Sequence, residues 1–165
     1  MKILLTGGTG FFGRSLLRHY LSQGRPAIDK ITVLSRSFER FLAVNPEFSG
    51  HPSITFVSGD IQQRNSLPWG HTFTHVLHAA TDSTIGPSLT PLQRYDQIVE
   101  GTRNILDLAV ATGARRLLLT SSGAIYGPLP ADLAATPEDW PGSPPRSEEH
   151  TSELQSPCNL VCRLL

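Results

Sequence analysis

A short apolar run at the start of the chain passes directly into a loop with glycines at three-residue intervals. Residues 2–6 read Lys-Ile-Leu-Leu-Thr, and Gly7, Gly10 and Gly13 follow. This pattern predicts a β-strand that turns sharply into an α-helix and leaves the N–H groups of the helix start free for a pyrophosphate. Gly7 and Gly10 leave room for the ligand, and Gly13 lets the helix pack closely on the strand. Glycines also mark ordinary turns, so the interpretation depends on the rest of the chain.

Strand patterns and helix patterns alternate over the next hundred residues. Apolar, β-branched runs predict further strands at residues 31–34, 54–57, 75–77 and 117–120. Apolar residues at helical spacing predict helices at residues 16–21, 38–43 and about 91–111, with stops at Gly24 and Gly113. Apolar strands alternating with helices are typical of a parallel sheet covered on both faces. The predicted class is α/β, with a Rossmann-type doubly wound parallel sheet.

The composition is that of a balanced chain of single-domain size. It has 165 residues, with 14 Lys and Arg against 14 Asp and Glu. This balance provides no basic field for nucleic acid, and the apolar run before Gly7 is too short for a signal peptide or a membrane span. The two cysteines, Cys158 and Cys162, have no metal-ligand spacing, so no metal site is predicted. We expect a cytoplasmic protein with neither a nucleic-acid nor a membrane partner.

The chain changes character after its fifth predicted strand. Residues 128–145 are rich in proline and predict a surface loop. Residues 146–165, RSEEHTSELQSPCNLVCRLL, can be written codon by codon as the two fixed arms of a common short-read sequencing adapter. The alternative is a genuine polar tail that ends in an apolar strand. We expect a domain over residues 1–145, truncated after the fifth strand, followed by a translated adapter that is not a domain.

Five motifs follow one another at the predicted strand ends and on the long helix. They are residues 6–13 (TGGTGFFG), Gly59-Asp60-Ile61, His78-Ala79-Ala80, Val99-Glu100-Gly101-Thr102 with Asn104, and Ser121-Ser122 through Tyr126-Gly127. Over residues 1 to about 145 the chain resembles the extended short-chain dehydrogenase/reductases of the NAD-dependent epimerase/dehydratase family. The resemblance implies a nicotinamide dinucleotide as cofactor and a nucleotide sugar as substrate of the complete protein. It leaves the oligomeric state open, with a homodimer of the complete protein as one expectation.

The resemblance also implies which residues touch the cofactor. The turn residues Gly7, Gly10, Phe11, Phe12 and Gly13 hold the pyrophosphate, Asp60 and Ile61 face the adenine, and Ala79, Ala80 and Thr81 lie under the nicotinamide ribose. Asp60 also suits an N-cap position for the segment that follows, and the two roles are compatible. His78 is expected to be a core histidine with satisfied hydrogen bonds and not a base.

The end of the second strand bears on the choice between NAD and NADP. NAD-specific folds place an acidic residue there to accept hydrogen bonds from the ribose, but this chain has Ser35-Arg36-Ser37. An arginine can instead clamp a 2′-phosphate, and the serines can donate hydrogen bonds to it. The sequence therefore favours NADP over NAD. The alternative is that Arg36 is a solvated surface residue.

Ser122 matches the family's catalytic Ser/Thr, which hydrogen-bonds the sugar hydroxyl or carbonyl at the reacting carbon. Ile98 replaces the usual asparagine of the helix motif. The Tyr-x-x-x-Lys pair that performs proton transfer in the family is absent, since the only lysines are Lys2 and Lys30. We interpret this absence as truncation and expect the chain as written to be inactive.

Two functional interpretations remain at this point. Gly123-Ala124 stands where the family's dehydratases place Asp-Glu, and these residues cannot transfer protons. This favours an NAD(P)-dependent epimerase or keto-sugar reductase over a dehydratase. The other interpretation is a non-catalytic, NADP-binding regulatory protein, which the missing Tyr-x-x-x-Lys favours only if Leu165 is the true terminus.

Overall fold

The computed structural model describes most of the predicted domain. The described residues are 1–23, 28–80, 89–121, 126–127, 129–130, 133, 135–137 and 139–140, together with the backbone of 158–163. The expected helix stop at Gly24 and most of the proline-rich loop lie outside these residues. So do Thr81 and Ser122.

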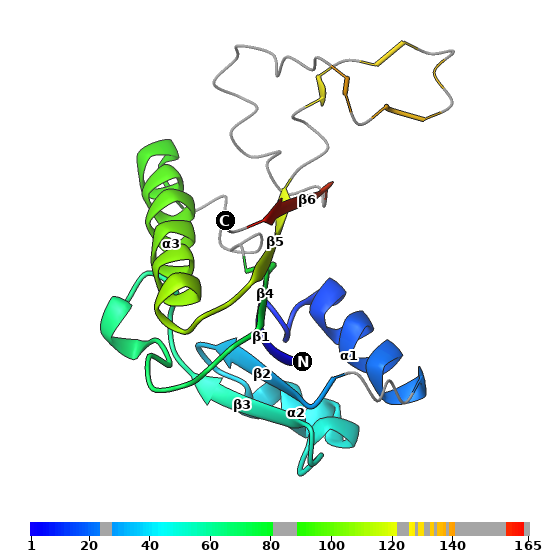
Figure 1. The fold of residues 1–165 in the computed structure, drawn as a ribbon, viewed down its shortest axis with the longest axis vertical. Helices are drawn as coiled ribbons and strands as arrows, with labels where there is room; N and C mark the ends of the chain where they lie inside the picture. Colours follow the sequence, from blue (N-terminus) through cyan, green and yellow to red (C-terminus); the bar gives the residue numbers. More distant parts are fainter. Residues whose placement is uncertain are drawn as a thin grey trace.

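Five parallel strands form the predicted sheet (Figure 1). They are β1 (Lys2–Thr6), β2 (Lys30–Ser35), β3 (Ile54–Ser58), β4 (His75–His78) and β5 (Arg116–Ser121). Each pairs in parallel with its neighbour in the order β3-β2-β1-β4-β5. The chain thus places β2 and β3 on one side of β1, and after β3 it crosses back and places β4 and β5 on the other side of β1. Such a reversal defines the switch point of a doubly wound sheet, and the predicted Rossmann-type fold is confirmed.

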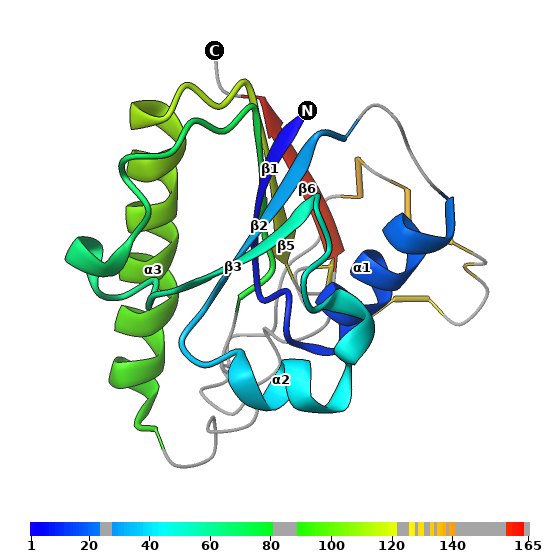
Figure 2. The same ribbon diagram turned by 90° about the horizontal axis from the view of Figure 1, so that it is seen from below.

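The helices cover the two faces of this sheet (Figure 2). α1 (Phe11–Gln23) and α2 (Glu39–Val44) lie on one face, and α3 (Pro91–Ala111) lies on the other. Two short 3₁₀ helices, η1 (Pro46–Phe48) and η2 (Arg64–Ser66), lie before and after β3. The side on which each helix lies follows from right-handed crossovers in opposite directions from β1.

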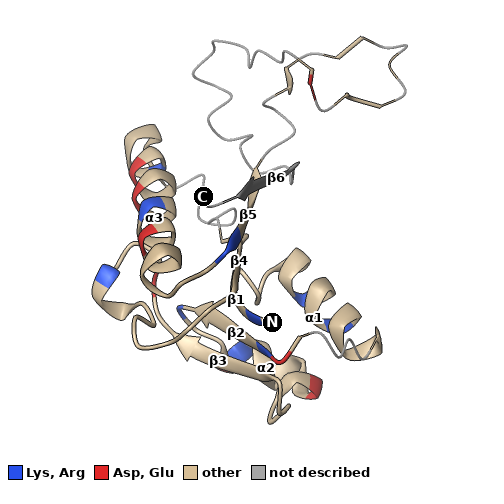
Figure 3. Cartoon of the chain, viewed as in Figure 1, with Lys and Arg blue, Asp and Glu red and all other residues tan. Residues whose placement is uncertain are grey.

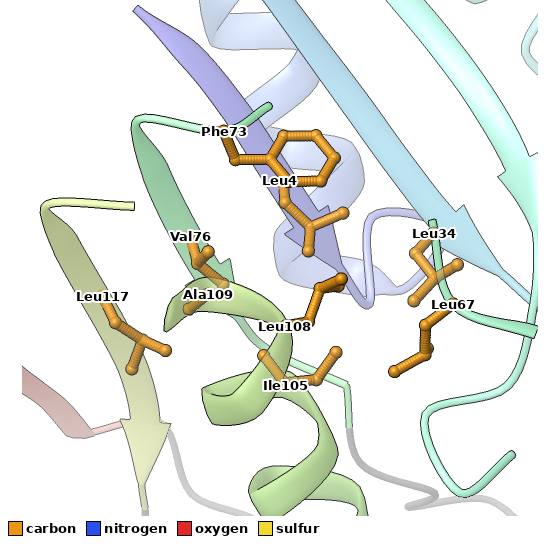
Figure 4. Close-up of a cluster of buried hydrophobic side chains, with 9 residues drawn as sticks. All are labelled: Leu4, Leu34, Leu67, Phe73, Val76, Ile105, Leu108, Ala109 and Leu117. Carbon is orange, nitrogen blue, oxygen red and sulfur yellow. The ribbon is translucent and has the colours of Figure 1, made fainter. Parts of the chain in front are cut away.

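Alternating residues of β1 divide the core into two layers, because successive side chains of a strand point to opposite faces. Leu5 belongs to the layer beneath α1 and α2. Leu4 belongs to the layer beneath α3, drawn in Figure 4. The buried members of this second layer are Leu4, Leu34, Leu67, Phe73, Val76, Ile105, Leu108, Ala109 and Leu117. Each layer buries apolar surface against helices, which provides the main driving force for the fold.

Local hydrogen bonds fix both ends of α3. Thr90 Oγ1 accepts from the N–H of Gln93 at 3.2 Å, and Gln93 Oε1 accepts from the N–H of Thr90 at 2.9 Å. This capping box, with Pro91 in the first helical position, satisfies donors that a helix start leaves free. At the other end Gly113 has a φ of +78°, as expected for the glycine predicted to close the helix.

A sixth strand, β6 (Cys158–Arg163), pairs antiparallel with β5. The adapter interpretation predicted no element after residue 145, whereas the alternative of a genuine tail predicted an apolar strand there, so β6 adds a strand to the five of the predicted sheet. Backbone pairing explains its position, because β5 would otherwise present a row of open N–H and C=O groups. β6 lies at the edge of the sheet and not in its centre. The adapter origin of residues 146–165 stays a prediction.

The described helices differ in charge, since α1 carries arginines and no acidic residue, whereas α3 carries both kinds. Acidic and basic residues are interspersed along α3 (Figure 3). None of the described helices combines the length and apolarity needed to cross a bilayer.

The glycine turn brings β1 and β4 together at their carboxyl ends. Gly7 has a φ of +73°, and a Cβ at this position would lie 2.4 Å from the carbonyl oxygen of Ala79. A Cβ at Gly13 would lie 2.3 Å from the carbonyl oxygen of Gly7. Gly13 therefore allows α1 to approach the glycine loop itself, where the sequence had predicted an approach to the strand.

Replacing Gly7 should destabilise the fold far more than replacing a glycine with the same backbone conformation in open space. Gly50 is the matched control, because its φ is +69° and a Cβ there would meet nothing within 4 Å. Gly50→Ala should cost about 1 kcal/mol, the cost of a left-handed conformation. Gly7→Ala should cost at least about 3 kcal/mol, because overpacking adds to that cost. Denaturant unfolding of the 165-residue chain measures both losses, and equal losses would contradict the close approach.

Candidate functional site

The loops at the carboxyl ends of four strands enclose a cleft of about 370 Å³. These loops follow β1, β2, β3 and β4, which lie next to one another in the sheet. Eight of the predicted cofactor residues line the cleft: Gly7, Gly10, Ser35, Arg36, Asp60, Ile61, Ala79 and Ala80. The site therefore lies where ligands bind in open α/β sheets, outside the strand ends at the switch point.

Three predicted residues at the start of α1 do not line the cleft with their side chains. Phe11 and Phe12 are 70% and 49% exposed, and their rings contact each other edge to face at 5.2 Å. Gly13 is buried behind the glycine loop. These residues belong to the first turn of a helix, whose N–H groups have no partner within the helix. Their backbone, and not their side chains, is the part available to an anion.

The cleft has six further lining residues, of which Ser37 alone was given a role from sequence, as a donor to a 2′-phosphate: Thr9, Leu34, Ser37, Gly59, Gln97 and Ile98. Four of them are direct chain neighbours of predicted residues. Gln97 and Ile98 come from α3, one turn before Gly101. Ile98 stands where the resemblance expects asparagine, so its place in the cleft could have been inferred from that position.

The loop after β2 is held by serine hydroxyls. Ser35 Oγ donates to the carbonyl oxygen of Ser37 at 3.1 Å and lies 3.4 Å from Thr9 Oγ1 in the glycine loop. Ser37 Oγ donates to Glu39 Oε2 at 3.1 Å. The backbone N–H of Glu39 and this hydroxyl lower the pKa of the carboxyl group, so Glu39 places a negative charge beside the loop. Arg36 and Glu39 thus present opposite charges near the end of β2.

Asp60 stabilises the turn after β3. Its Oδ1 accepts from the N–H of Gln62 at 3.0 Å, and its own N–H donates to Ser66 Oγ at 2.8 Å. The hydrogen bond to Gln62 closes a turn of the kind that Asp favours. The next helix, η2, has Gln63 at its N-cap position, so the N-cap expected at Asp60 is wrong. The residue also lines the cleft, so its turn hydrogen bonds are sterically compatible with the adenine contact that the sequence predicts.

His78, at the end of β4, lies between two threonine hydroxyls. Its Nδ1 is 2.7 Å from Thr6 Oγ1, and its Nε2 is 3.4 Å from Thr102 Oγ1. The residue is 3% exposed, and this burial lowers its pKa to about 4. The imidazole is therefore neutral near pH 7. The expectation of a core histidine with satisfied hydrogen bonds is confirmed.

The model of the NAD dependent epimerase/dehydratase family matches residues 3–151. The chain belongs to this family. Its match begins with β1 and continues a few residues past Arg146, where the predicted adapter starts.

Curated members of the epimerase/dehydratase family with similar sequences include sugar and steroid enzymes. The UDP-glucose 4-epimerase of Klebsiella pneumoniae is 31% identical over 134 residues, which are 79% of this chain and 95% of that sequence. That of Yersinia enterocolitica is 29% identical over 77% of this chain and 38% of its own. Human 3 beta-hydroxysteroid dehydrogenase type 7 is 30% identical over 76% of this chain and 33% of its own. The chain thus spans about a third of the length of the last two relatives.

Solved structures show the same relation to longer epimerase/dehydratase-family proteins. A dTDP-glucose 4,6-dehydratase from Streptomyces venezuelae, solved with NAD, is 28% identical with a TM-score of 0.73. The alignment covers 94% of this chain and 49% of that one. A UDP-galactose 4-epimerase is also 28% identical, with a TM-score of 0.64, over 87% of this chain and 45% of that one. This chain corresponds to just under half of each.

The described part of this family member's cleft has the properties of a binding site. Arg36 and Asp60 are the only ionisable side chains among its lining residues. A Cβ at Gly10 would meet only the carbonyl oxygen of Gly7, at 3.2 Å, so this glycine keeps the cleft open beside the start of α1. Bare backbone, a helix start and one guanidinium suit a phosphate-bearing ligand. The residues therefore fit a dinucleotide.

Acid should destabilise the domain through His78. Its pKa is about 4 in the folded chain, against about 6.5 when exposed. As the pH falls, the unfolded chain binds the proton first, so the stabilisation is complete above about pH 6.5 and is lost progressively down to about pH 4. The expected loss is about 3 kcal/mol.

The matched variant is His78→Asn, which does not titrate and retains an acceptor for Thr6. Its stability should fall by about 3 kcal/mol less than that of the wild type between pH 7 and pH 4. Denaturant unfolding of both chains across this range measures the difference. Parallel pH profiles would show that His78 is not buried as described.

Proposed function

We propose that residues 1–145 form the cofactor-binding part of an NAD(P)-dependent nucleotide-sugar epimerase or keto-sugar reductase. One observation carries the proposal: four strand-end loops, three of them bearing a family motif, meet around one cleft. A parallel sheet brings all its strand-end loops to one edge, so the support comes from the family motifs that three of these loops carry. The NAD-bound dehydratase from Streptomyces venezuelae, which shares the fold, supports a nicotinamide dinucleotide as the ligand.

Different parts of the cleft would hold different parts of the dinucleotide. Gly7 and Gly10 lack side chains, so the pyrophosphate would lie against their backbone and the N–H groups of Phe11, Phe12 and Gly13 at the start of α1. Asp60 and Ile61 would contact the adenine. Ala79, Ala80 and Thr81 would lie beneath the nicotinamide ribose.

We propose NADP as the preferred cofactor, with NAD as the alternative. Arg36 lines the cleft just past the end of β2, where its guanidinium can bind a 2′-phosphate. Ser35 and Ser37 supply hydroxyl groups in the same loop. The carboxylate of Glu39, held by Ser37, opposes a second negative charge nearby. The preference for NADP therefore depends on whether the attraction of the 2′-phosphate to Arg36 is stronger than its repulsion by Glu39.

The bound nicotinamide would accept and return a hydride at a sugar carbon. Ser122 would orient the hydroxyl or carbonyl group at that carbon. Proton transfer would need the Tyr-x-x-x-Lys pair, which this sequence lacks. We propose that the pair follows residue 145 in the complete protein, that residues 146–165 are translated adapter, and that this chain is inactive. A homodimer of the complete protein is part of the same proposal.

The substrate is proposed from Gly123-Ala124 and from the relatives. Residues without proton-transferring side chains favour an epimerase or keto-sugar reductase over a dehydratase. Two UDP-glucose 4-epimerases are among the similar proteins. A steroid dehydrogenase is nearly as similar, so a hydroxysteroid is the comparison substrate in any assay.

Exchanging the charge at position 36 should change the cofactor preference. Arg36→Asp replaces a phosphate clamp with a ribose acceptor and should shift the ratio of NADP to NAD affinity by at least about tenfold towards NAD. Arg40→Asp is the matched control, because it makes the same charge change outside the cleft lining. Calorimetric titration of both dinucleotides measures the ratio. An unchanged ratio in Arg36→Asp would exclude the clamp.

The 165-residue chain should bind dinucleotide without turnover. General base catalysis contributes about 10²–10⁴-fold, and Ser122 alone cannot supply it near neutral pH. The control is the complete protein, in which the genomic sequence downstream of Pro145 replaces residues 146–165. Both proteins are given nucleotide sugars and a hydroxysteroid, and turnover is measured as a change in nicotinamide absorbance. Activity in the completed protein alone would support the enzyme. If no Tyr-x-x-x-Lys follows in frame, the non-catalytic regulatory protein is the better interpretation.

A further inference from the structure

We propose that α3 is a positioning element for both ends of the dinucleotide cleft. Gly101 and Asn104 contact Ile61 in the loop after β3, and Thr102 contacts His78, the last residue of β4, but none of these three motif residues lines the cleft. This inference rests on the proposed function, since it assigns a role to residues that act through the proposed cofactor contacts.

The first contact holds the adenine end. Asn104 Nδ2 donates to the carbonyl oxygen of Ile61 at 2.9 Å, and Asn104 is only 6% exposed. Gly101 lies against the same residue, because a Cβ there would be 2.7 Å from Ile61 Cδ1. α3 therefore holds Ile61 through its backbone and through its side chain. Ile61 and its neighbour Asp60 both line the cleft.

The second contact holds the nicotinamide end through a chain of three side chains. Thr6 Oγ1 accepts from the N–H groups of Ala79 and Ala80, each at 3.2 Å. A hydroxyl that already accepts two hydrogen bonds has its own proton left to donate, and His78 Nδ1 is the acceptor at 2.7 Å. His78 must then carry its proton on Nε2 and donate it to Thr102 Oγ1 at 3.4 Å.

This chain of hydrogen bonds runs from α3 through the core to the backbone of the cleft. Thr102 orients the ring of His78, the ring orients the hydroxyl of Thr6, and the hydroxyl holds Ala79 and Ala80. Thr120 Oγ1 donates to the carbonyl oxygen of His78 at 3.2 Å and ties the same strand end to β5. One contact of α3 is made directly to the loop after β3, and the other reaches the loop after β4 through His78 and Thr6, so their effects on binding are separable.

The test compares a whole dinucleotide with its adenine half. NADP and AMP are titrated into the 165-residue chain and its variants. Asn104→Ala should weaken AMP and NADP by the same factor, about tenfold for the loss of one buried hydrogen bond. Thr6→Val and Thr102→Val should weaken NADP by up to about tenfold and AMP by less than about twofold. Thr6→Ser keeps the hydroxyl and should restore NADP binding.

A control separates positioning from loss of stability. Thr112 is a buried threonine that follows α3, and its hydroxyl donates to the carbonyl oxygen of Leu108 at 2.7 Å, away from the cleft. Thr112→Val should lower stability without changing either affinity. Amide hydrogen exchange adds a structural readout, because the N–H of Ala80 should exchange faster in Thr6→Val. The N–H of Ala79 also donates to the carbonyl oxygen of Thr6 at 3.2 Å and should change less.

Each outcome decides the inference. Variants that fold and bind both ligands like the wild type would overturn it, as would a Thr112→Val variant that loses the same affinity. If Thr6→Val does not fold, Thr102→Val and Thr6→Ser decide the nicotinamide end. If the wild-type chain binds neither NADP nor AMP, the proposed function fails, and the positioning role falls with it. Wild-type binding with unchanged variants refutes the positioning role alone.

Discussion

The structure depends on the close approach of two backbones at Gly7 and Ala79. This approach places the turn after β1 against the end of β4, so the switch point of the sheet is narrow and lined by main chain. Any side chain at Gly7 would separate the two strand ends. The cleft, the hydrogen bonds of Thr6 and the start of α1 all follow from this contact. The proposed phosphate site therefore requires glycine at position 7 for steric reasons that hold in the fold itself, before any ligand is considered.

Strands and helices with strong local patterns were predictable from sequence. α3 begins at Pro91 and ends at Ala111, as its apolar spacing predicted, and the five parallel strands follow the apolar runs. β6 was not predictable in this way, because its place depends on the open edge of β5, a property of the assembled sheet. The close packing at Gly13 was predicted, but its partner was not. The sequence predicted that α1 packs on the strand, whereas Gly13 lies against the glycine loop, whose path local patterns do not show.

The site was predictable where a residue follows a strand end, because parallel strands bring their carboxyl ends to one edge. That is why Asp60 and Ala80, twenty residues apart, line one cleft. Gln97 and the hydrogen bonds of Thr102 and Asn104 were not predictable, because helical periodicity does not say which loop a helix meets. His78 illustrates the difference: its type and strand position predicted burial, but its two threonine partners come from β1 and α3.

The strand order has a consequence for synthesis on the ribosome. β1 is made first, yet it is the central strand of the five and pairs with β2 on one side and β4 on the other. β2 ends at Ser35 and β4 at His78, so the edge of β1 that pairs with β4 stays unpaired until the intervening residues have been synthesised. At about 5–20 residues per second this delay lasts several seconds. During that time the nascent chain exposes an apolar strand edge, the form of surface that chaperones bind.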